Sequence, residues 1–71
     1  MQLENKYPVH RRMETVAQVG ERIGRGKSWI HAAVQRGEFP APVRLSSRCT
    51  RWDSFAIDRW IETQFEGKAE R

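Results

Sequence analysis

Residues 23–52 decide the fold of this chain, and they read IGRGKSWIHAAVQRGEFPAPVRLSSRCTRW. The first half has the pattern of a turn followed by a short helix that stops at Gly37, because glycine adopts the left-handed conformation that ends many helices. Two prolines then exclude a helix, and the second half alternates around a polar turn, which predicts a hairpin of two short strands. We therefore expect a helix and a hairpin side by side, supported by the rest of the chain.

A first helix is expected just before this stretch. Thr15 and Gln18 have the spacing of a capping box, so the helix begins after Thr15 and ends near Arg22. Ile23 is then placed in the core, and Gly24 allows the sharp turn that follows. Two helices joined by a short glycine-containing turn form a helix-turn-helix, although this pattern alone is weakly specific.

The second helix, at about residues 27–36, has two distinct faces at about 100° per residue. Its apolar face consists of Ile30, Ala33 and Val34. The opposite face carries short or hydrogen-bonding side chains with cations at its edges: Ser28, His31, Ala32 and Gln35, flanked by Lys27, Trp29 and Arg36. Such a face suits a helix that enters the major groove of DNA. A merely solvated helix more usually mixes glutamate with lysine.

The hairpin is expected over residues 43–45 and 50–52, with Ser46 and Ser47 in its turn. From the alternation we expect four of its side chains to face the core: Val43, Leu45, Thr50 and Trp52. The arginines are expected on the outer side, with Arg44 and Arg51 on the strands and Arg48 at the tip. A hairpin of this kind beside a helix-turn-helix is a wing, whose arginines can reach the DNA backbone or a narrow minor groove.

The last helix is predicted from Ser54 to about Glu66, with Asp53 as its cap. Its apolar face is predicted to cover the core with Ala56, Ile57, Trp60, Ile61 and Phe65. Phe55 falls off this face and is left for a contact with the wing or with another subunit. The resulting organisation is a flexible arm at 1–12, one winged helix-turn-helix domain at 13–66 and a charged tail at 67–71. In the arm, Arg11 and Arg12 are either further phosphate contacts or simply solvated.

Charge and composition narrow the class of partner. The chain has 71 residues and a formal net charge of +4, and residues 22–51 hold seven basic residues against the single acid Glu38. Such a concentration of cations suits a polyanion, because neutralising phosphates releases condensed counterions. No apolar run approaches the roughly 20 residues of a membrane span, and no signal-peptide pattern opens the chain. We expect a soluble, cytoplasmic protein that does not bind membranes.

Catalytic and cofactor chemistry is not expected. The single cysteine, Cys49, has no partner for a disulfide, and no His/Cys cluster has metal-site spacing. His10 and His31 do not suggest a catalytic dyad, and Arg-Gly-Lys-Ser at 25–28 lacks the upstream glycine and strand of a phosphate-binding loop. We therefore predict no enzyme, no cofactor and no metal.

The chain resembles the AlpA family of small phage and prophage regulators, which belongs to the excisionase-like, MerR-like group of winged-helix domains. The most specific part is the block Arg36–Leu45 (RGEFPAPVRL) with its spacing to Trp52 and Trp60. The similarity covers roughly residues 13–64. It implies sequence-specific binding to double-stranded DNA, with the second helix in the major groove and the hairpin as the wing. Five features depart from the family pattern, so the architecture is carried over but not any DNA site: Arg25, Gly26, Trp29, His31 and the Ser46-Ser47 turn.

These observations give a site hypothesis with alternatives. The predicted DNA contacts are Arg25, Lys27, Ser28, Trp29, His31, Gln35 and Arg36 on the helix, and Arg44, Ser46, Ser47, Arg48 and Arg51 on the wing. The first interpretation is a phage-type transcriptional regulator, and the second is an excisionase that bends attachment-site DNA for an integrase. A protein-interaction module that uses residues 53–66 is the third. Possible partners besides DNA are an integrase or the transcription machinery, with weak or no dimerisation in solution and cooperation between copies on DNA.

Overall fold

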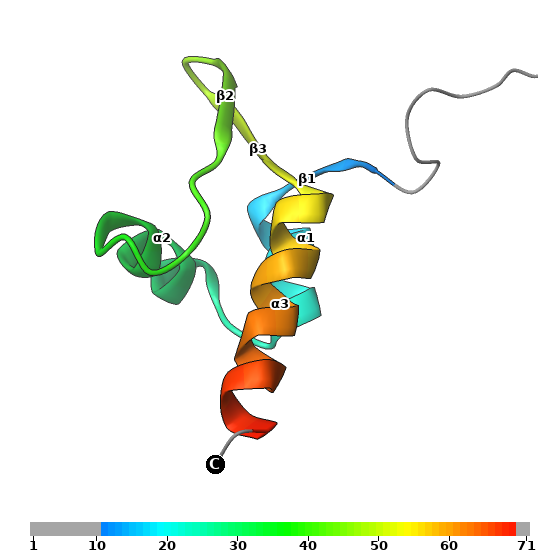
Figure 1. Ribbon diagram of the computed structural model, residues 1–71. Helices are drawn as coiled ribbons and strands as arrows, with labels where there is room; N and C mark the ends of the chain where they lie inside the picture. The colour runs from blue at the N-terminus through cyan, green and yellow to red at the C-terminus, as the bar shows by residue number, and fades with distance from the viewer. Residues whose placement is uncertain (1–10, 70–71) are drawn as a thin grey trace, which may run out of the picture.

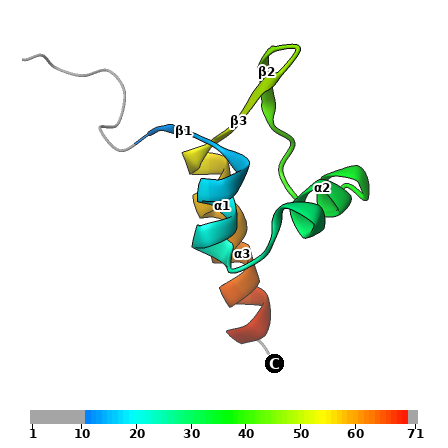
Figure 2. The same ribbon diagram turned by 180° about the vertical axis from the view of Figure 1, so that it is seen from behind.

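The computed structural model describes residues 11–69 of the chain, with the side chains of residues 68 and 69 excepted. In chain order the elements are β1 (Met13–Glu14), α1 (Val16–Ile23), α2 (Lys27–Gln35), β2 (Val43–Ser46), β3 (Cys49–Asp53) and α3 (Ser54–Ala69). The helix α3 lies in front of α1 in Figure 1 and behind it in Figure 2, α2 stands to one side of both, and the β2–β3 hairpin projects beyond all three. This arrangement confirms the predicted fold class, three helices with a β-hairpin wing. Residues 1–10 of the predicted arm lie outside the described residues.

The predicted start of α1 and the glycine stops after α1 and α2 are confirmed, because they depend on local chemistry. The Thr15 hydroxyl accepts a hydrogen bond from the Gln18 amide at 3.1 Å, and the Gln18 side chain accepts one from the Thr15 amide at 2.9 Å. Gly24 and Gly37 have φ angles of 72° and 76°, the left-handed conformation that only glycine adopts without strain. The helix α2 ends at Gln35, one residue before the predicted end.

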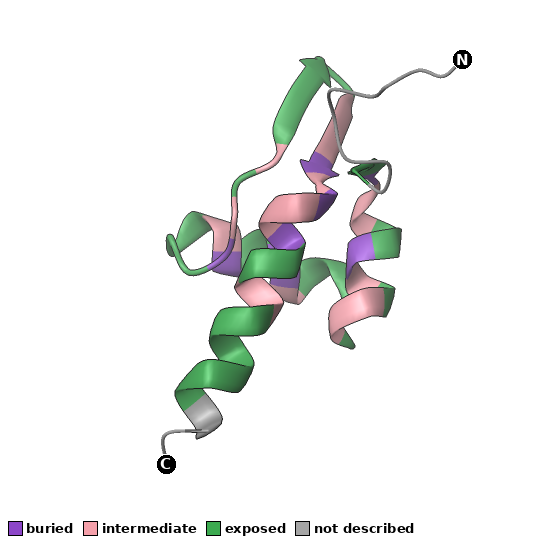
Figure 3. Cartoon of the chain, turned by 45° about the vertical axis from the view of Figure 1, so that its right-hand side comes forward, coloured by how far each residue is buried: buried purple, intermediate pink, exposed green. Residues whose placement is uncertain are grey.

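One core joins the three helices to the base of the wing (Figure 3). Its buried apolar side chains are Val19, Ile30, Ala33, Phe39, Trp52 and Ile57. Ile23 and Val34 pack against this cluster, as predicted. Phe65 does not, because it is 71% exposed, and its predicted place in the core is wrong. The physical reason is length: α3 continues to Ala69, and its last turns run past the ends of α1 and α2 (Figure 1).

The wing presents different faces from those predicted. Val43 is paired with Arg51, and Arg44 with Thr50, in the antiparallel β2–β3 ladder. Since directly opposed residues share a face of the sheet, Arg44 and Arg51 lie on opposite faces. Arg44 shares the face of Thr50, and of Trp52 two residues further along β3.

The prediction that Val43 and Leu45 face the core is therefore wrong, since these side chains are 42% and 52% exposed. Alternation within a strand gives its two faces but does not say which residues pair across the hairpin. Here the pairing is shifted by an irregularity between Arg44 and Ser46. No non-glycine residue among those described has a positive φ, so the tight turn at the tip is not of the primed type that matches strand twist.

A third strand was not predicted. The strand β1 pairs antiparallel with β3, Met13 with Asp53 and Glu14 with Trp52, so that the strand order is β1-β3-β2. Two residues are too few to show a period of two in the sequence.

The residues just before β1 are also fixed to the domain. The Arg11 guanidinium donates to the Asp53 carboxylate at 2.8 and 3.1 Å. The backbone of Arg12 exchanges hydrogen bonds with Ser54, one to the hydroxyl at 2.7 Å and one from the amide at 2.8 Å. The Arg11 guanidinium also lies 5.6 Å from the centre of the Phe55 ring, which accounts for the residue that the helical pattern left unplaced. Both arginines described from the predicted arm are thus held against the wing base and α3.

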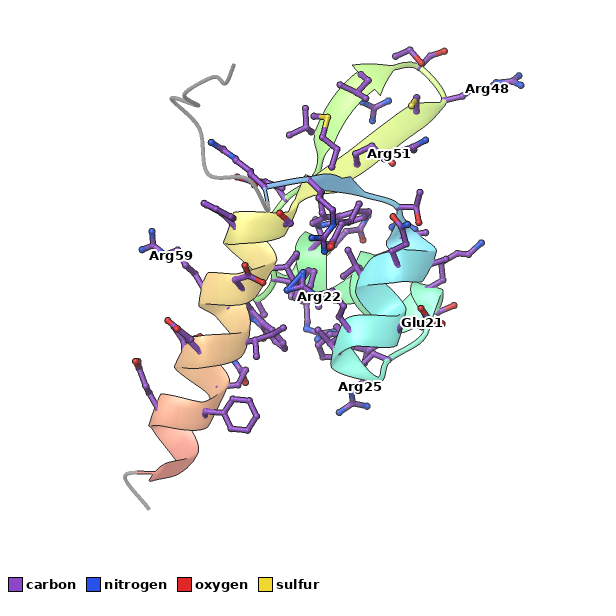
Figure 4. The ribbon with its side chains drawn as sticks, turned by 90° about the vertical axis from the view of Figure 1, so that its right-hand side faces the viewer. Glu21, Arg22, Arg25, Arg48, Arg51 and Arg59 are labelled. Atoms are coloured by element: carbon purple, nitrogen blue, oxygen red, sulfur yellow. The ribbon has the colours of Figure 1, made fainter. Side chains whose placement is uncertain are left out.

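A buried carboxylate holds α1, α3 and the sheet together. The Glu14 side chain is only 3% exposed, and it accepts hydrogen bonds from Arg12 at 2.6 Å and from Arg22 at 3.1 Å. The other terminal nitrogen of Arg22 pairs with Asp58 on α3. In Figure 4, Arg22 lies between the two helices. A charge this deeply buried is stable only with such partners.

Candidate nucleic-acid interface

The exposed face of α2 is the first part of the candidate site. Ser28, His31, Ala32 and Gln35 are all exposed, on the side of the helix opposite the buried Ile30 and Ala33. Their exposure is what the sequence pattern predicted. Together they form a row of small or hydrogen-bonding side chains that a groove of DNA can accommodate without a bulky obstacle.

This row continues onto one face of the wing. The His31 ring centre lies 6.3 Å from that of Trp52, at the base of β3. Because Arg44 and Thr50 share the strand face of Trp52, they follow His31 outward along the hairpin. The helix face and this wing face therefore form one surface.

Two indole groups fix the linker between the helix and the wing. The Nε1–H of Trp52 donates to the Pro40 carbonyl at 2.8 Å, and that of Trp60 donates to the Glu38 carbonyl at 3.1 Å. Sequence reasoning assigned both tryptophans to the core but missed these hydrogen bonds. The available signal was the indole N–H itself, which needs an acceptor when its ring is buried. The linker has no regular structure, and these bonds set where the wing stands relative to α2.

The wing tip is polar and cationic. Ser46, Ser47 and Arg48 are all exposed, and Arg48 points away from the body of the molecule (Figure 4). Arg51 is half-buried on the opposite face from Arg44, and its guanidinium donates to the Thr50 carbonyl at 2.9 Å. The three wing arginines predicted to act together are thus distributed over both faces and the tip.

The cations of α2 and of the wing differ in whether they make an ion pair within the protein. Within residues 11–67, Lys27, Arg44 and Arg48 make no ion pair, and all three are exposed. Arg36 is engaged within the protein, since its Nε donates to the Glu38 carboxylate at 3.0 Å. On the side of the exposed α2 row, the cations without an ion pair thus lie at the start of α2 and along the wing. Arg25 and Arg59 also make no ion pair among the described residues, but Arg25 lies over Trp29 and Arg59 lies on α3.

Trp29 and Arg25 lie away from the row that contains His31. The Trp29 ring packs edge-on against Phe39 at 6.1 Å and against Trp60 at 6.3 Å. The Arg25 guanidinium lies 4.8 Å from the centre of the Trp29 ring. The structure therefore brings Ser28, His31 and Gln35 together but turns these two predicted site residues toward α3.

One carboxylate at the wing base is held ionised. The Arg11 guanidinium, which donates to Asp53, keeps the pKa of that carboxyl below its usual value, and the Phe55 amide also donates to it at 3.0 Å. The latter bond is the helix cap predicted for Asp53. Asp53 pairs with Met13 on the face of Arg51, so its charge lies away from the row of α2.

Comparison with protein families gives a match over residues 11–65 to the family described as Prophage CP4-57 regulatory protein (AlpA). The chain belongs to this family. The match spans both helices of the helix-turn-helix, the wing and most of α3, so it includes every residue of the surface described above. The family is a small phage-type regulatory one. Curated proteins and solved structures give no significant match to the chain.

In the described part of the chain, no group of three or more His, Cys, Asp or Glu side chains is placed to hold a metal ion. Over the same residues, none of the helices has the length and apolar character needed to span a membrane.

Proposed function

We propose that this AlpA-family protein is a sequence-specific double-stranded DNA-binding protein that acts as a phage-type or prophage-type transcriptional regulator. The observation that carries the proposal is the single surface formed by the exposed row of α2 and the Arg44 face of the wing. It combines hydrogen-bonding side chains at the spacing of a groove-entering helix with cations that have no ion-pair partner in the described part of the chain. The family match supports the same assignment.

On this surface, α2 enters the major groove, and Ser28, His31 and Gln35 contact base edges. Lys27 at the start of the helix and Arg44 and Arg48 on the wing contact phosphates or the adjacent minor groove. Phosphate contacts supply affinity and position, whereas base contacts supply sequence preference. Trp29 serves this surface indirectly, because its packing against Phe39 and Trp60 fixes α2 on the core.

Binding to labelled duplexes from the gene's own upstream region, with a scrambled duplex as control, tests the proposal. Specific binding is expected. The logarithm of the association constant should fall linearly with the logarithm of salt concentration, with a slope of roughly −0.9 for each phosphate neutralised. Equal weak binding to both duplexes at all salt concentrations would contradict sequence-specific recognition. Absence of binding at low salt would remove the DNA-binding assignment altogether.

A matched pair of variants tests the surface itself. Arg44→Gln should weaken binding to every sequence and lower the magnitude of the salt slope by about 1, because one phosphate contact is lost. Arg51→Gln removes the same charge from the opposite face of the wing and should have a smaller effect. Equal effects of the two substitutions would refute the assignment of one wing face to DNA.

Sequence preference is expected to depend on the α2 row. Gln35→Ala should change the discrimination between bases at one position of the site by roughly 1–3 kcal/mol, since a bidentate contact is lost. Ala32→Ser, a small change on the same face, is the control that leaves this contact intact. Competition with a set of single-base variants of the preferred duplex measures both.

A further inference from the structure

A groove opens where the C-terminal half of α3 passes the turn between α1 and α2. Its volume is about 320 Å³. Its lining is mostly apolar and aromatic, from Ile23, Trp29, Trp60, Ile61 and Phe65, and the polar side chains that line it include Arg22, Arg25 and Gln64. The groove lies on the Trp29 side of α2, so an occupant would leave the row of Ser28, His31 and Gln35 free.

Phe65 is the most exposed large apolar side chain described, at 71%. It lies on the last turns of α3, beyond the part of the helix that the core covers (Figure 3). Transfer of a phenyl side chain from water to an apolar site is favourable, because apolar surface is removed from water. Because Phe65 also lines the aromatic groove, the exposed ring and the groove form one contiguous apolar patch, and such patches mark interaction sites.

Unpaired charges accompany this ring and this groove. Within residues 11–67, no carboxylate pairs with Arg25, whose guanidinium stands over the Trp29 ring. Glu62 precedes Phe65 by one helical turn on the same flank of α3 and also has no ion-pair partner in that part of the chain. Glu21, the acid on α1 closest in sequence to Arg25, points away from α3 (Figure 4).

We propose that the occupant of this groove is a second copy of the chain, bound through a two-fold contact between the C-terminal halves of α3. The groove offers an aromatic lining and a cation, and the same surface offers a phenyl ring with a carboxylate one helical turn away. In a two-fold contact the same patch serves both subunits. Phe65 of each chain enters the groove of the other, and Glu62 of each chain pairs with Arg25 of the other.

The patch is small, which sets the expected strength of the contact. It comprises the groove and the last turns of one helix, less than the roughly 800 Å² per partner of a standard stable interface. We therefore expect weak, reversible association in solution. Two copies on neighbouring DNA sites would associate more readily, because the effective concentration there reaches about millimolar. The contact does not depend on the proposed DNA-binding function, since it uses the opposite side of α2.

Sedimentation velocity of the full chain without DNA, from about 10 µM to about 1 mM, tests this contact. The average sedimentation coefficient should rise with concentration and should stay at the monomer value for Phe65→Ser. This variant removes an exposed ring, so circular dichroism should show an unchanged fold. Its binding to a single DNA site should match that of the unaltered chain, which separates this inference from the proposed function.

Charge reversal identifies the partner as a second copy. Arg25→Glu and Glu62→Arg should each weaken association by roughly tenfold, because a two-fold contact contains the pair twice and each exposed pair is worth up to about 1 kcal/mol. The double variant should recover it, since both pairs re-form with reversed sign. Arg59→Glu is the matched control, because Arg59 lies on the far flank of α3 (Figure 4). A monomer at every concentration, an equal effect of Arg59→Glu, or no recovery in the double variant would overturn the proposal.

Discussion

Replacing Arg22 by methionine should remove most of the stability of the domain. Arg22 is 24% exposed and donates to both oxygens of the buried Glu14 carboxylate at 3.1 Å. Loss of one partner of a buried ion pair typically costs 3–5 kcal/mol, because the remaining charge stays desolvated. Arg12 still contacts Glu14 in the variant, so we expect the lower end, about 3 kcal/mol. A domain of this size has only roughly 3–5 kcal/mol to lose.

Urea unfolding followed by tryptophan fluorescence measures this loss, because Trp52 lies in the core. Asp58→Asn is the control: Asp58 contacts the same arginine but is 55% exposed, so its loss should cost less than about 1 kcal/mol. Replacing both buried partners, Glu14→Leu with Arg22→Met, should restore much of the stability, since no unpaired buried charge is left. An Arg22→Met domain within about 1 kcal/mol of the unaltered chain would refute the reasoning.

Three further predictions follow from local geometry. Gly20→Ala should lower the melting temperature in thermal unfolding, because the added Cβ would lie 2.6 Å from the Arg25 carbonyl oxygen. Gly26→Ser should raise the melting temperature slightly, because a serine N-cap adds a few tenths of a kcal/mol to the free energy of unfolding. The N-cap of α2 now has no side-chain hydrogen bond, and a Cβ there meets open space. The folded pKa of Asp53 is lowered by Arg11, so the stability from this pair is present above the unfolded pKa and is lost as pH falls through the folded one. The difference in urea midpoint between Arg11→Gln and the unaltered chain should therefore shrink between pH 7 and pH 3, and a constant difference would contradict the pairing.

Sequence alone determined the features that depend on neighbours along the chain. The Thr15 cap, the glycine turns at 24 and 37 and the apolar stripe of α2 all follow from hydrogen bonding, φ restriction or helical period over a few residues. The exposed row of the candidate site was predictable for the same reason, since a helix with one buried face necessarily presents the other. The family resemblance agreed with this local pattern over nearly the whole described domain.

The tertiary structure alone decided which distant groups meet. Which residues share a face of the wing depends on the cross-strand register, which neither strand's own sequence specifies. This register places Arg44 and Arg51 on opposite faces and leaves Leu45 exposed. Glu14 reads as an ordinary surface acid until the fold brings Arg22 of α1 to it, and Arg22 pairs in turn with Asp58 of α3. Phe65 fits the apolar stripe of α3, yet it is exposed because the stripe extends further along the helix than the core that covers it. Periodicity predicts which side of a helix or strand a residue lies on. Whether that side is buried depends on which elements pack against it, and their arrangement is set by the whole chain.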